Sequence, residues 1–362
     1  MDDRRIWLSL AQAQGVGPSR ILALVSHFGS PGKLRGASLN EIKQVRGIGS
    51  HTAEIIARAI DGSDCSASAG RLLNDLERLG IGLVTYEDDI YPPLLRTIND
   101  PPLVLYMKGT LKEEDTRSLA VVGARKASDY GKKAAAIIAG DLACNDFTVV
   151  SGLARGIDSC AHRGALDRGG RTIGVLGCGP DIFYPPENAR LQREMESHGA
   201  VLSEFPPGTK PEKGNFPLRN RIIAGMTMGT LVVEADLRSG SLITAGLALS
   251  MGREVFAVPG SILSALSRGT HGLIREGAKL VERVGDILEE FNITPKEEEL
   301  QGVLLTGEEK HVLKLIGDGG KTANELMELL DEEPQQLLAR LTVMEVRGII
   351  RKTCGTTYMR KK

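Results

Sequence analysis

One stretch decides the fold of this chain: Lys213-Gly214-Asn215-Phe216-Pro217-Leu218-Arg219-Asn220-Arg221, which runs into Ile222-Ile223-Ala224 and the apolar strand Thr230–Glu234. Pro217 suits the first turn of a helix, where its missing N–H costs nothing. At about 100° per residue, Leu218, Ile222, Ile223 and Met226 share one face of that helix, which we expect to be buried. A helix followed by a short apolar strand is the repeating unit of an α/β domain.

The same stretch gathers chemistry at the start of its helix. Phe216 stands among the cations Lys213, Arg219 and Arg221, and Asn220 lies between the two arginines. Cations, a ring and free N–H groups at a helix start suit a phosphate backbone that carries a base to stack. The alternative is a solvated basic helix start with Phe216 as part of the core.

Composition limits the possible functions. The 362 residues predict two or three domains, and 41% hydrophobic with 25% charged residues is ordinary for a soluble globular protein. The formal net charge of −1 excludes a global basic field. Between Gly208 and Ile223, however, four cations face one anion, a local charge of +3. Any contact with nucleic acid must therefore come from a local patch.

Cysteine usage predicts a reducing compartment. The chain has five scattered cysteines and no C-x-x-C pair, so we expect neither a disulfide framework nor a structural zinc site, and no metal. The charged N-terminus does not resemble a signal peptide, and no run of 18 apolar residues predicts a membrane span. We therefore expect a cytoplasmic protein that makes no contact with a membrane.

Residues 1–70 predict a small helical domain. Two segments place a hydrophobic residue between two glycines before a helix, Gly15-Val16-Gly17 and Gly47-Ile48-Gly49. This pattern is similar to the hairpins of helix-hairpin-helix (SAM-like) domains, whose N–H groups face DNA phosphates. The alternative is a helical module whose glycines only end helices.

Strands and helices alternate through residues 116–292. The strands are short continuous apolar runs such as Thr172–Leu176, as expected when helices cover both faces of a parallel sheet. We predict a doubly wound, extended Rossmann-like α/β domain, reached through a connecting segment at residues 71–115. A charged linker at 293–304 precedes residues 305–362, where three helices and a hairpin predict a winged helix. The winged helix could bind DNA, a protein or a second copy of the chain.

Glycine-bearing turns follow four predicted strands, and backbone N–H groups there can hold anions. Their candidate binding residues are Gly123, Arg125, Ser151, Gly152, Arg155, Ser239 and Gly240. The first turn lacks the later glycines of G-x-G-x-x-G, and no P-loop occurs, so we expect no nicotinamide or ATP cofactor. Asp158 and His162 are spaced like part of a catalytic set. No G-x-S-x-G elbow accompanies them, His162 is expected on the helix exterior, and Asp158 reads better as an N-cap.

These turns, taken together in order, resemble the DNA-processing protein A (DprA/Smf) family. The motifs that carry the resemblance are Val121-Val122-Gly123-Ala124-Arg125, Ser151-Gly152-Leu153-Ala154-Arg155-Gly156-Ile157-Asp158, Gly177-Cys178-Gly179 with Tyr184-Pro185, Asn215-Phe216-Pro217 with Arg219-Asn220-Arg221, and Ser239-Gly240-Ser241 with Val258-Pro259-Gly260. They span the whole α/β domain.

The resemblance implies a non-enzymatic protein that binds single-stranded DNA, protects incoming strands in natural transformation and loads a RecA-type recombinase. By this resemblance, the residues that correspond to the family's binding pocket are Arg125, Lys213, Phe216, Asn220 and Arg221. It also implies a homodimer formed through residues 269–280, for which we expect contacts from His271, Ile274 and Leu280.

Two other functions stay open at this point. A phosphoribohydrolase that cleaves nucleoside monophosphates would share the fold, but its P-G-G-x-G-T-x-x-E run is reduced here to Gly229-Thr230-Leu231 and Glu234. A transcription regulator would act through the winged helix, and duplex-specific binding by residues 305–362 would favour it.

Overall fold

The structure, a computed structural model, describes residues 3–296, 306–317, 319–330, 332, 334–346, 349–353 and 357–360. It divides into two compact units, residues 1–295 and 296–362. Most of the expected linker, from residue 297 to residue 304, lies outside the described residues. Within the described ranges, each helix is too short or too polar to cross a lipid bilayer.

The first unit begins with a helical domain. Its helices are α1 (Asp3–Ala11), α2 (Pro18–Phe28), α3 (Leu39–Lys43), α4 (Ser50–Asp61) and α5 (Ser63–Arg78), with the short 3-10 turn η1 (Pro31–Leu34) after α2. Gly15 and Gly47 take φ values of 83° and 86°, which residues with a Cβ rarely adopt, so both hairpins need their glycines. The domain's core continues onto the sheet, because Trp7 shares a buried cluster with Leu83 and Tyr106.

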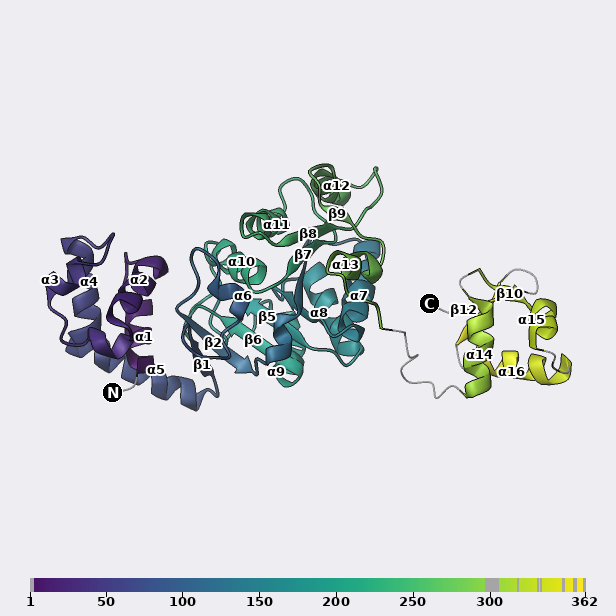
Figure 1. Ribbon diagram of the computed structural model, residues 1–362, viewed down its shortest axis with the longest axis horizontal. Coiled ribbons are helices and arrows are strands. Elements are labelled where there is room, and N and C mark those ends of the chain that lie inside the picture. The colour runs from purple at the N-terminus through teal and green to yellow at the C-terminus, as the bar shows by residue number, and fades with distance from the viewer. Residues whose placement is uncertain are drawn as a thin grey trace. The chain divides into compact units, whose positions relative to one another are not determined.

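A nine-stranded sheet forms the centre of this unit (Figure 1). Its spatial order is β1 (Gly82–Thr85), β2 (Val104–Gly109), β6 (Gly199–Ser203), β5 (Thr172–Leu176), β4 (Thr148–Ser151), β3 (Ser118–Val122), β7 (Gly229–Val232), β8 (Glu254–Ala257) and β9 (Lys279–Leu280). Strands β3 to β9 pair in parallel, whereas β1 and β2 pair antiparallel and join the sheet beside β6. The segment that connects the helical domain to the α/β domain thus supplies two strands of the sheet.

Helices cover both faces of the sheet, as the apolar strands predicted. On one face α10 (Asn215–Gly225), α11 (Gly240–Ser250) and the short α6 (Pro93–Arg96) pack on Ala120 and Val122 of β3. On the other face α7 (Asp129–Cys144), α8 (Ile157–Asp167) and α13 (Val284–Glu290) pack on Leu119 and Val121. The remaining elements are α9 (Ala189–His198), α12 (Arg268–Arg275) and the 3-10 turns η2 (Glu113–Thr116), η3 (Pro186–Asn188) and η4 (Ala265–Ser267).

The chain reverses its direction of travel across the sheet at β3. Strands β4, β5 and β6 follow on one side of β3, and β7 and β8 follow on the other. In open α/β sheets ligands bind beyond the carboxyl ends of the strands at such a switch point. The turns after β3, β4 and β5 therefore lie where a binding site is expected.

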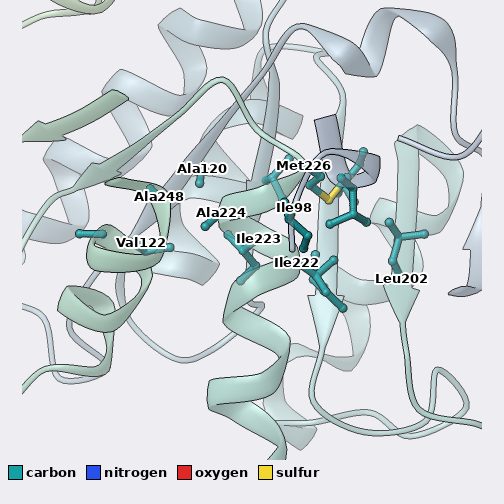
Figure 2. Close-up of a cluster of buried hydrophobic side chains, with 14 of the residues drawn as sticks. Ile98, Ala120, Val122, Leu202, Ile222, Ile223, Ala224, Met226 and Ala248 are labelled. Atoms are coloured by element: carbon teal, nitrogen blue, oxygen red, sulfur yellow. The ribbon is translucent and has the colours of Figure 1, made fainter. Parts of the chain in front are cut away.

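Helix α10 follows the predicted helix with one correction. Ile222, Ile223 and Met226 are buried in the cluster of Figure 2, but Leu218 is 53% exposed. Arg219 takes the buried position instead, since residues 219, 222, 223 and 226 share the inward face. The predicted apolar face was wrong by one position because an arginine, not the leucine, enters the interior.

The second unit contains three helices and a small antiparallel sheet. The helices are α14 (Gly307–Ile316), α15 (Ala323–Leu330) and α16 (Pro334–Val346), and the strand order is β10 (Lys321–Thr322), β12 (Thr357–Arg360), β11 (Ile350–Lys352). Its own core includes Val312, Leu326, Leu341 and Tyr358.

Candidate functional site

A small hollow opens beyond the carboxyl ends of β3, β4 and β5. It holds about 30 Å³ of free space. Its lining comes from the turns after three strands and from the start of α10: Arg125, Gly152, Ala154, Arg155, Leu176, Gly177, Cys178, Tyr184, Pro185, Phe216 and Arg219. Residues distant in the sequence therefore meet at the switch point of the sheet, and five of the predicted binding residues are among them.

A buried pair of opposite charges forms the base of this hollow. The Nη1 of Arg219 donates to the carbonyl oxygens of Gly152, at 2.8 Å, and Val175. Asp158 accepts from the backbone N–H groups of Gly152 at 3.2 Å and Ala154 at 3.3 Å. Burial lowers the pKa of Arg219 to about 10, which still leaves the guanidinium charged at neutral pH. Burial likewise raises the pKa of Asp158, while Arg219 and the two N–H donors oppose that shift.

The predicted role of Asp158 is corrected by these contacts. The residue before α8 is Gly156, which makes no side-chain cap, and Asp158 instead binds the loop that precedes the helix. His162 is likewise not on the helix exterior, because its ring is fully buried and its Nδ1 lies 2.6 Å from Oγ1 of Thr172. Neither side chain is placed to act with the other on a substrate in the hollow.

An aromatic pair and a cation form the outer wall. The rings of Phe216 and Tyr184 are stacked, with centroids 5.7 Å apart and an angle of 30° between their planes. The guanidinium carbon of Arg125 lies over the Phe216 ring, 5.2 Å from its centroid. Phe216 is only partly buried, and Arg125 is exposed. This arrangement offers a cation and a ring face at one point of the surface.

Two glycines lack the Cβ that would collide with the side chains of Phe216 and Arg219. A Cβ added at Gly177 would lie 2.8 Å from Cδ1 of Phe216, and one added at Gly152 would lie 2.5 Å from Nη2 of Arg219. Gly123 is constrained in the same way, since its Cβ would lie 2.6 Å from Ile157. These glycines are therefore needed for close packing, whether or not their N–H groups also meet an anion.

The loop after β4 is held in an unusual conformation. Leu153 has a φ of 54°, in the left-handed region that a leucine rarely enters. Nδ2 of Asn188 donates to the Leu153 carbonyl at 2.9 Å, and Asp158 accepts from the N–H of the next residue, Ala154. Such strain persists only where the surroundings determine it, so the loop between β4 and α8 is rigidly preorganised.

The other predicted binding residues lie at or beyond the edge of the hollow. Lys213 is exposed in the loop before α10. Ser151 is buried and donates to the carbonyl of Val121 at 2.6 Å, so its hydroxyl is already used. Arg155 lines the hollow, but its Nε and Nη2 donate to the two carboxylate oxygens of Glu187.

Arg221 points away from the hollow. Its Nη2 donates to both carboxylate oxygens of Glu204, at 2.5 Å and 2.6 Å, and Nη1 donates to the carbonyl of Asp100 at 2.6 Å. The side chain of Arg221 is only 12% exposed. Asn220 accepts from Nε of Arg219 at 3.2 Å and so supports the buried arginine. The expected phosphate contact from Arg221 is thus replaced by an ion pair, because α10 turns that face toward β6.

Ser239 and Gly240 begin α11 after β7 and are not among the residues that line the hollow. Ser239 caps α11 by accepting from the N–H of Ser241 at 3.4 Å. Glu234, in the same region, is buried and accepts from the backbone N–H of Ser128 at 2.8 Å and from its hydroxyl. The carboxylate that a phosphoribohydrolase would need is therefore engaged in capping α7.

The residues expected at a dimer interface lie at the far edge of the sheet. Leu280 is in the edge strand β9 and is 42% exposed. His271 and Ile274 are partly buried in α12, and Nε2 of His271 lies 3.1 Å from the Gly260 carbonyl oxygen. Next to that contact, Ile262 and Leu263 are 86% and 92% exposed.

Six lining residues of the hollow were not among the predicted binding residues: Ala154, Leu176, Gly177, Cys178, Tyr184 and Pro185. Asp158, which holds the loop at the base of the hollow, was not assigned to the site either. A ring before a proline and an acid after a glycine turn are weak signals by themselves. Only the distance between the turn after β5 and the start of α10 shows that Tyr184 meets Phe216.

Comparison with known proteins agrees with this architecture. Residues 82–292 match the family described as DNA recombination-mediator protein A, and residues 8–61 match the SAM-like helix-hairpin-helix tandem. The family match covers more than half of the chain, including every element that builds the hollow.

The chain belongs to the DNA recombination-mediator protein A family.

Relatives support this membership. The DNA processing protein DprA of Streptococcus pneumoniae is 51% identical over 204 residues, which are 56% of this chain and 72% of that protein. An X-ray structure of DprA from the same organism matches with a TM-score of 0.68 and 38% identity, over 80% of this chain and 98% of that one. A structure concerned with single-stranded DNA binding by DNA processing protein A of Helicobacter pylori matches with a TM-score of 0.53 and 31% identity, over 58% of this chain and 95% of that one. The DprA/Smf resemblance is confirmed.

Proposed function

We propose that this chain binds single-stranded DNA at the hollow formed by Arg125, Phe216 and the turns after β4 and β5, without altering it chemically. The observation that carries the proposal is the contact between Arg125 and Phe216, which puts an exposed cation beside a ring at the mouth of a glycine-rich switch point. A ring face accepts any unpaired base, and stacking contributes about 1–3 kcal/mol per base. The family membership and the relative from Helicobacter pylori support this choice of ligand.

The roles of the residues follow from their positions. Arg125 and Lys213 are exposed and neutralise phosphates, whereas Arg219 stays buried and holds the turns in place. Because Arg125 now lies over the ring of Phe216, a base stacks there only after the guanidinium moves to a phosphate. Duplex DNA is excluded, since its paired bases have no free face to offer.

The wider role we propose is that of a recombination mediator in natural transformation. The protein would protect incoming strands and load a RecA-type recombinase onto them. A homodimer through α12 and β9 would place two hollows on one strand and raise the effective concentration of the second contact. The exposed Leu280 and the neighbouring Ile262 support that surface as the dimer contact.

For the second unit we propose a winged helix. Three helices and a three-stranded sheet in the order β10-β12-β11 support that assignment. The exposed residues of α16 include Leu338 and Val343, and Arg340 is engaged by Glu332 and Glu308.

The proposal is tested by measuring the binding of fluorescein-labelled (dT)20 and of a 20-base-pair duplex to the whole chain. We expect the single strand to bind at least tenfold more tightly, with no change to the strand recovered afterwards. Equal affinity for the duplex would contradict the proposed site. Release of free base from nucleoside monophosphates would instead favour the phosphoribohydrolase.

A further inference from the structure

A second hollow lies near the first, between α7, α8 and the start of α9. It holds about 360 Å³. Its lining residues come from α7, α8 and the η3–α9 segment: Ala136, Ser159, Cys160, Arg163, Glu187, Asn188, Arg190 and Leu191. None of these residues lines the first hollow. The second hollow is therefore a separate space, and nothing in the proposed function has used it.

Only one loop separates the two hollows. Arg155, on the wall of the first, pairs with Glu187, on the wall of the second. Ser159 of the second hollow donates to the carbonyl of Ala154 in the first. Nδ2 of Asn188 holds the same loop through Leu153 and also donates to Ser159 at 2.8 Å. A strand leaving the first hollow across this loop would enter the second.

The second hollow also has the size and the charge that a nucleotide needs. Its volume falls in the range of about 300–1,000 Å³ that small-molecule pockets occupy. Its cations are Arg163, which donates to Glu194 at 2.8 Å, and Arg190. Arg190 is exposed and makes no hydrogen bond or ion pair within the described part of the chain. Arg155 neutralises Glu187 and Glu194 neutralises Arg163, so the net positive charge of this hollow comes from Arg190.

We propose that this second hollow holds the nucleotide next to the one bound at Phe216, on the same single strand, with Arg190 contacting its phosphate. The inference rests on the proposed function, because it extends the path of that strand by one step. The planar guanidinium of Arg163 and the apolar side chains of Leu191 and Ala136 offer a face for an unpaired base.

The first test removes the free cation. Arg190→Ala is compared with Arg193→Ala, which removes an exposed arginine three residues further along α9 that packs on Phe183 and does not line the hollow. We expect Arg190→Ala to weaken (dT)20 binding about fivefold and to lower its salt slope by about 0.7, the value for one phosphate on a single strand. Arg193→Ala should bind like the unchanged protein.

Comparison with Arg125→Ala separates this inference from the proposed function. If Arg125→Ala weakens binding and Arg190→Ala leaves both affinity and slope unchanged, the second hollow is overturned and the first stands. If Arg125→Ala also leaves binding unchanged, the proposed function fails as well.

The second test uses Cys160 as a reporter inside the hollow. Burial raises the pKa of both Cys160 and Cys178, to about 11 for Cys178, but Cys160 is partly exposed whereas Cys178 of the first hollow is buried, so Cys160 is the more accessible of the two thiols. We expect (dT)20 with an activated disulfide on one internal sugar to cross-link to the unchanged protein and not to Cys160→Ser. Unmodified (dT)20 should suppress the cross-link, and thymidine monophosphate at equal nucleotide concentration should not. Absence of the Cys160 cross-link, or equal suppression by the mononucleotide, would overturn the strand assignment.

Discussion

Asp158 and Arg219 hold the same residue from opposite sides: Asp158 accepts the N–H of Gly152, and Arg219 donates to its carbonyl oxygen. Both side chains are buried, at 6% and 5% exposure, and they carry opposite charges. A Cβ at Gly152 would lie 2.5 Å from the guanidinium of Arg219, so only glycine fits between them. This clamp fixes the turn after β4, on which the proposed binding site is built.

Removing one charge of the clamp should be costly. We expect Asp158→Asn to destabilise the fold by about 3–5 kcal/mol, because it leaves the buried Arg219 without its counter-charge. Urea unfolding at pH 7.5 measures the loss. The double variant with Arg219→Met should recover part of it, since the uncompensated charge is then gone. A loss below about 1 kcal/mol in Asp158→Asn would show that the pair does not act as a clamp.

Filling the space beside Phe216 should affect binding more than folding. In Gly177→Ala the new Cβ would lie 2.8 Å from the ring, which must shift from its place against Tyr184. We expect the affinity for (dT)20 to fall about tenfold and the stability to fall by about 1–3 kcal/mol. Gly214→Ala is the matched control, because its Cβ meets nothing within 4 Å. Equal binding by both variants would remove Phe216 from the site.

Acid should destabilise the protein through His162. Its Nδ1 donates to Oγ1 of Thr172, whose own proton goes to the Val149 carbonyl, and its Nε2 has no partner. Burial lowers the pKa of His162 from 6.5 to about 3. Below pH 6.5 the histidine is protonated in the unfolded chain but stays neutral in the folded chain. The stability that His162 contributes is therefore fully present above pH 6.5 and is lost as the pH falls below that value.

The size of the His162 effect follows from the same linkage. Each pH unit between 6.5 and 3 should lower the free energy of unfolding by about 1.4 kcal/mol through this residue. Urea unfolding at pH 7.5, 6.5 and 5.5 should show a smaller pH slope for His162→Gln than for the unchanged chain. Identical slopes would mean that His162 titrates normally in the folded state.

The proposed dimer surface is tested by changing Leu280. Leu280→Arg puts a charge into the expected contact, so we predict monomers by light scattering. We also predict weaker (dT)20 binding, because a monomer lacks the binding site that the other protomer of a dimer would add. Leu39→Arg is the matched control, since Leu39 is 41% exposed and Leu280 is 42% exposed. If both variants have the mass of the unchanged protein, the interface lies elsewhere.

The sheet could be predicted from the sequence because its signal is local. The run Thr172–Leu176 is apolar throughout and coincides with β5. The order of the strands could not be predicted in the same way for β2, whose partner β6 is about a hundred residues away. Pairing over such a distance leaves no trace in the periodicity of either strand.

The site was predicted only in part, for a physical reason. Arg125 and Phe216 do meet, because the turn after β3 and the start of α10 lie at the same edge of the parallel sheet. Arg219 and Arg221 were both predicted to be surface cations, and both are held by distant partners, carbonyl oxygens in one case and Glu204 in the other. The charge of an arginine can be read from the sequence, but its partner depends on the tertiary fold.

The proposed binding of an unpaired strand depends most on Arg125 and Lys213, which neutralise its phosphates. The direct measurement is the affinity for (dT)20 across salt concentrations for Arg125→Ala, Lys213→Ala and the control Lys112→Ala, whose exposed cation precedes β3 at the opposite edge of the sheet. We predict that each of the first two variants binds more weakly and lowers the salt slope by about 0.7, while the control matches the unchanged protein. Unchanged affinity and slope in both site variants would contradict the proposed binding site.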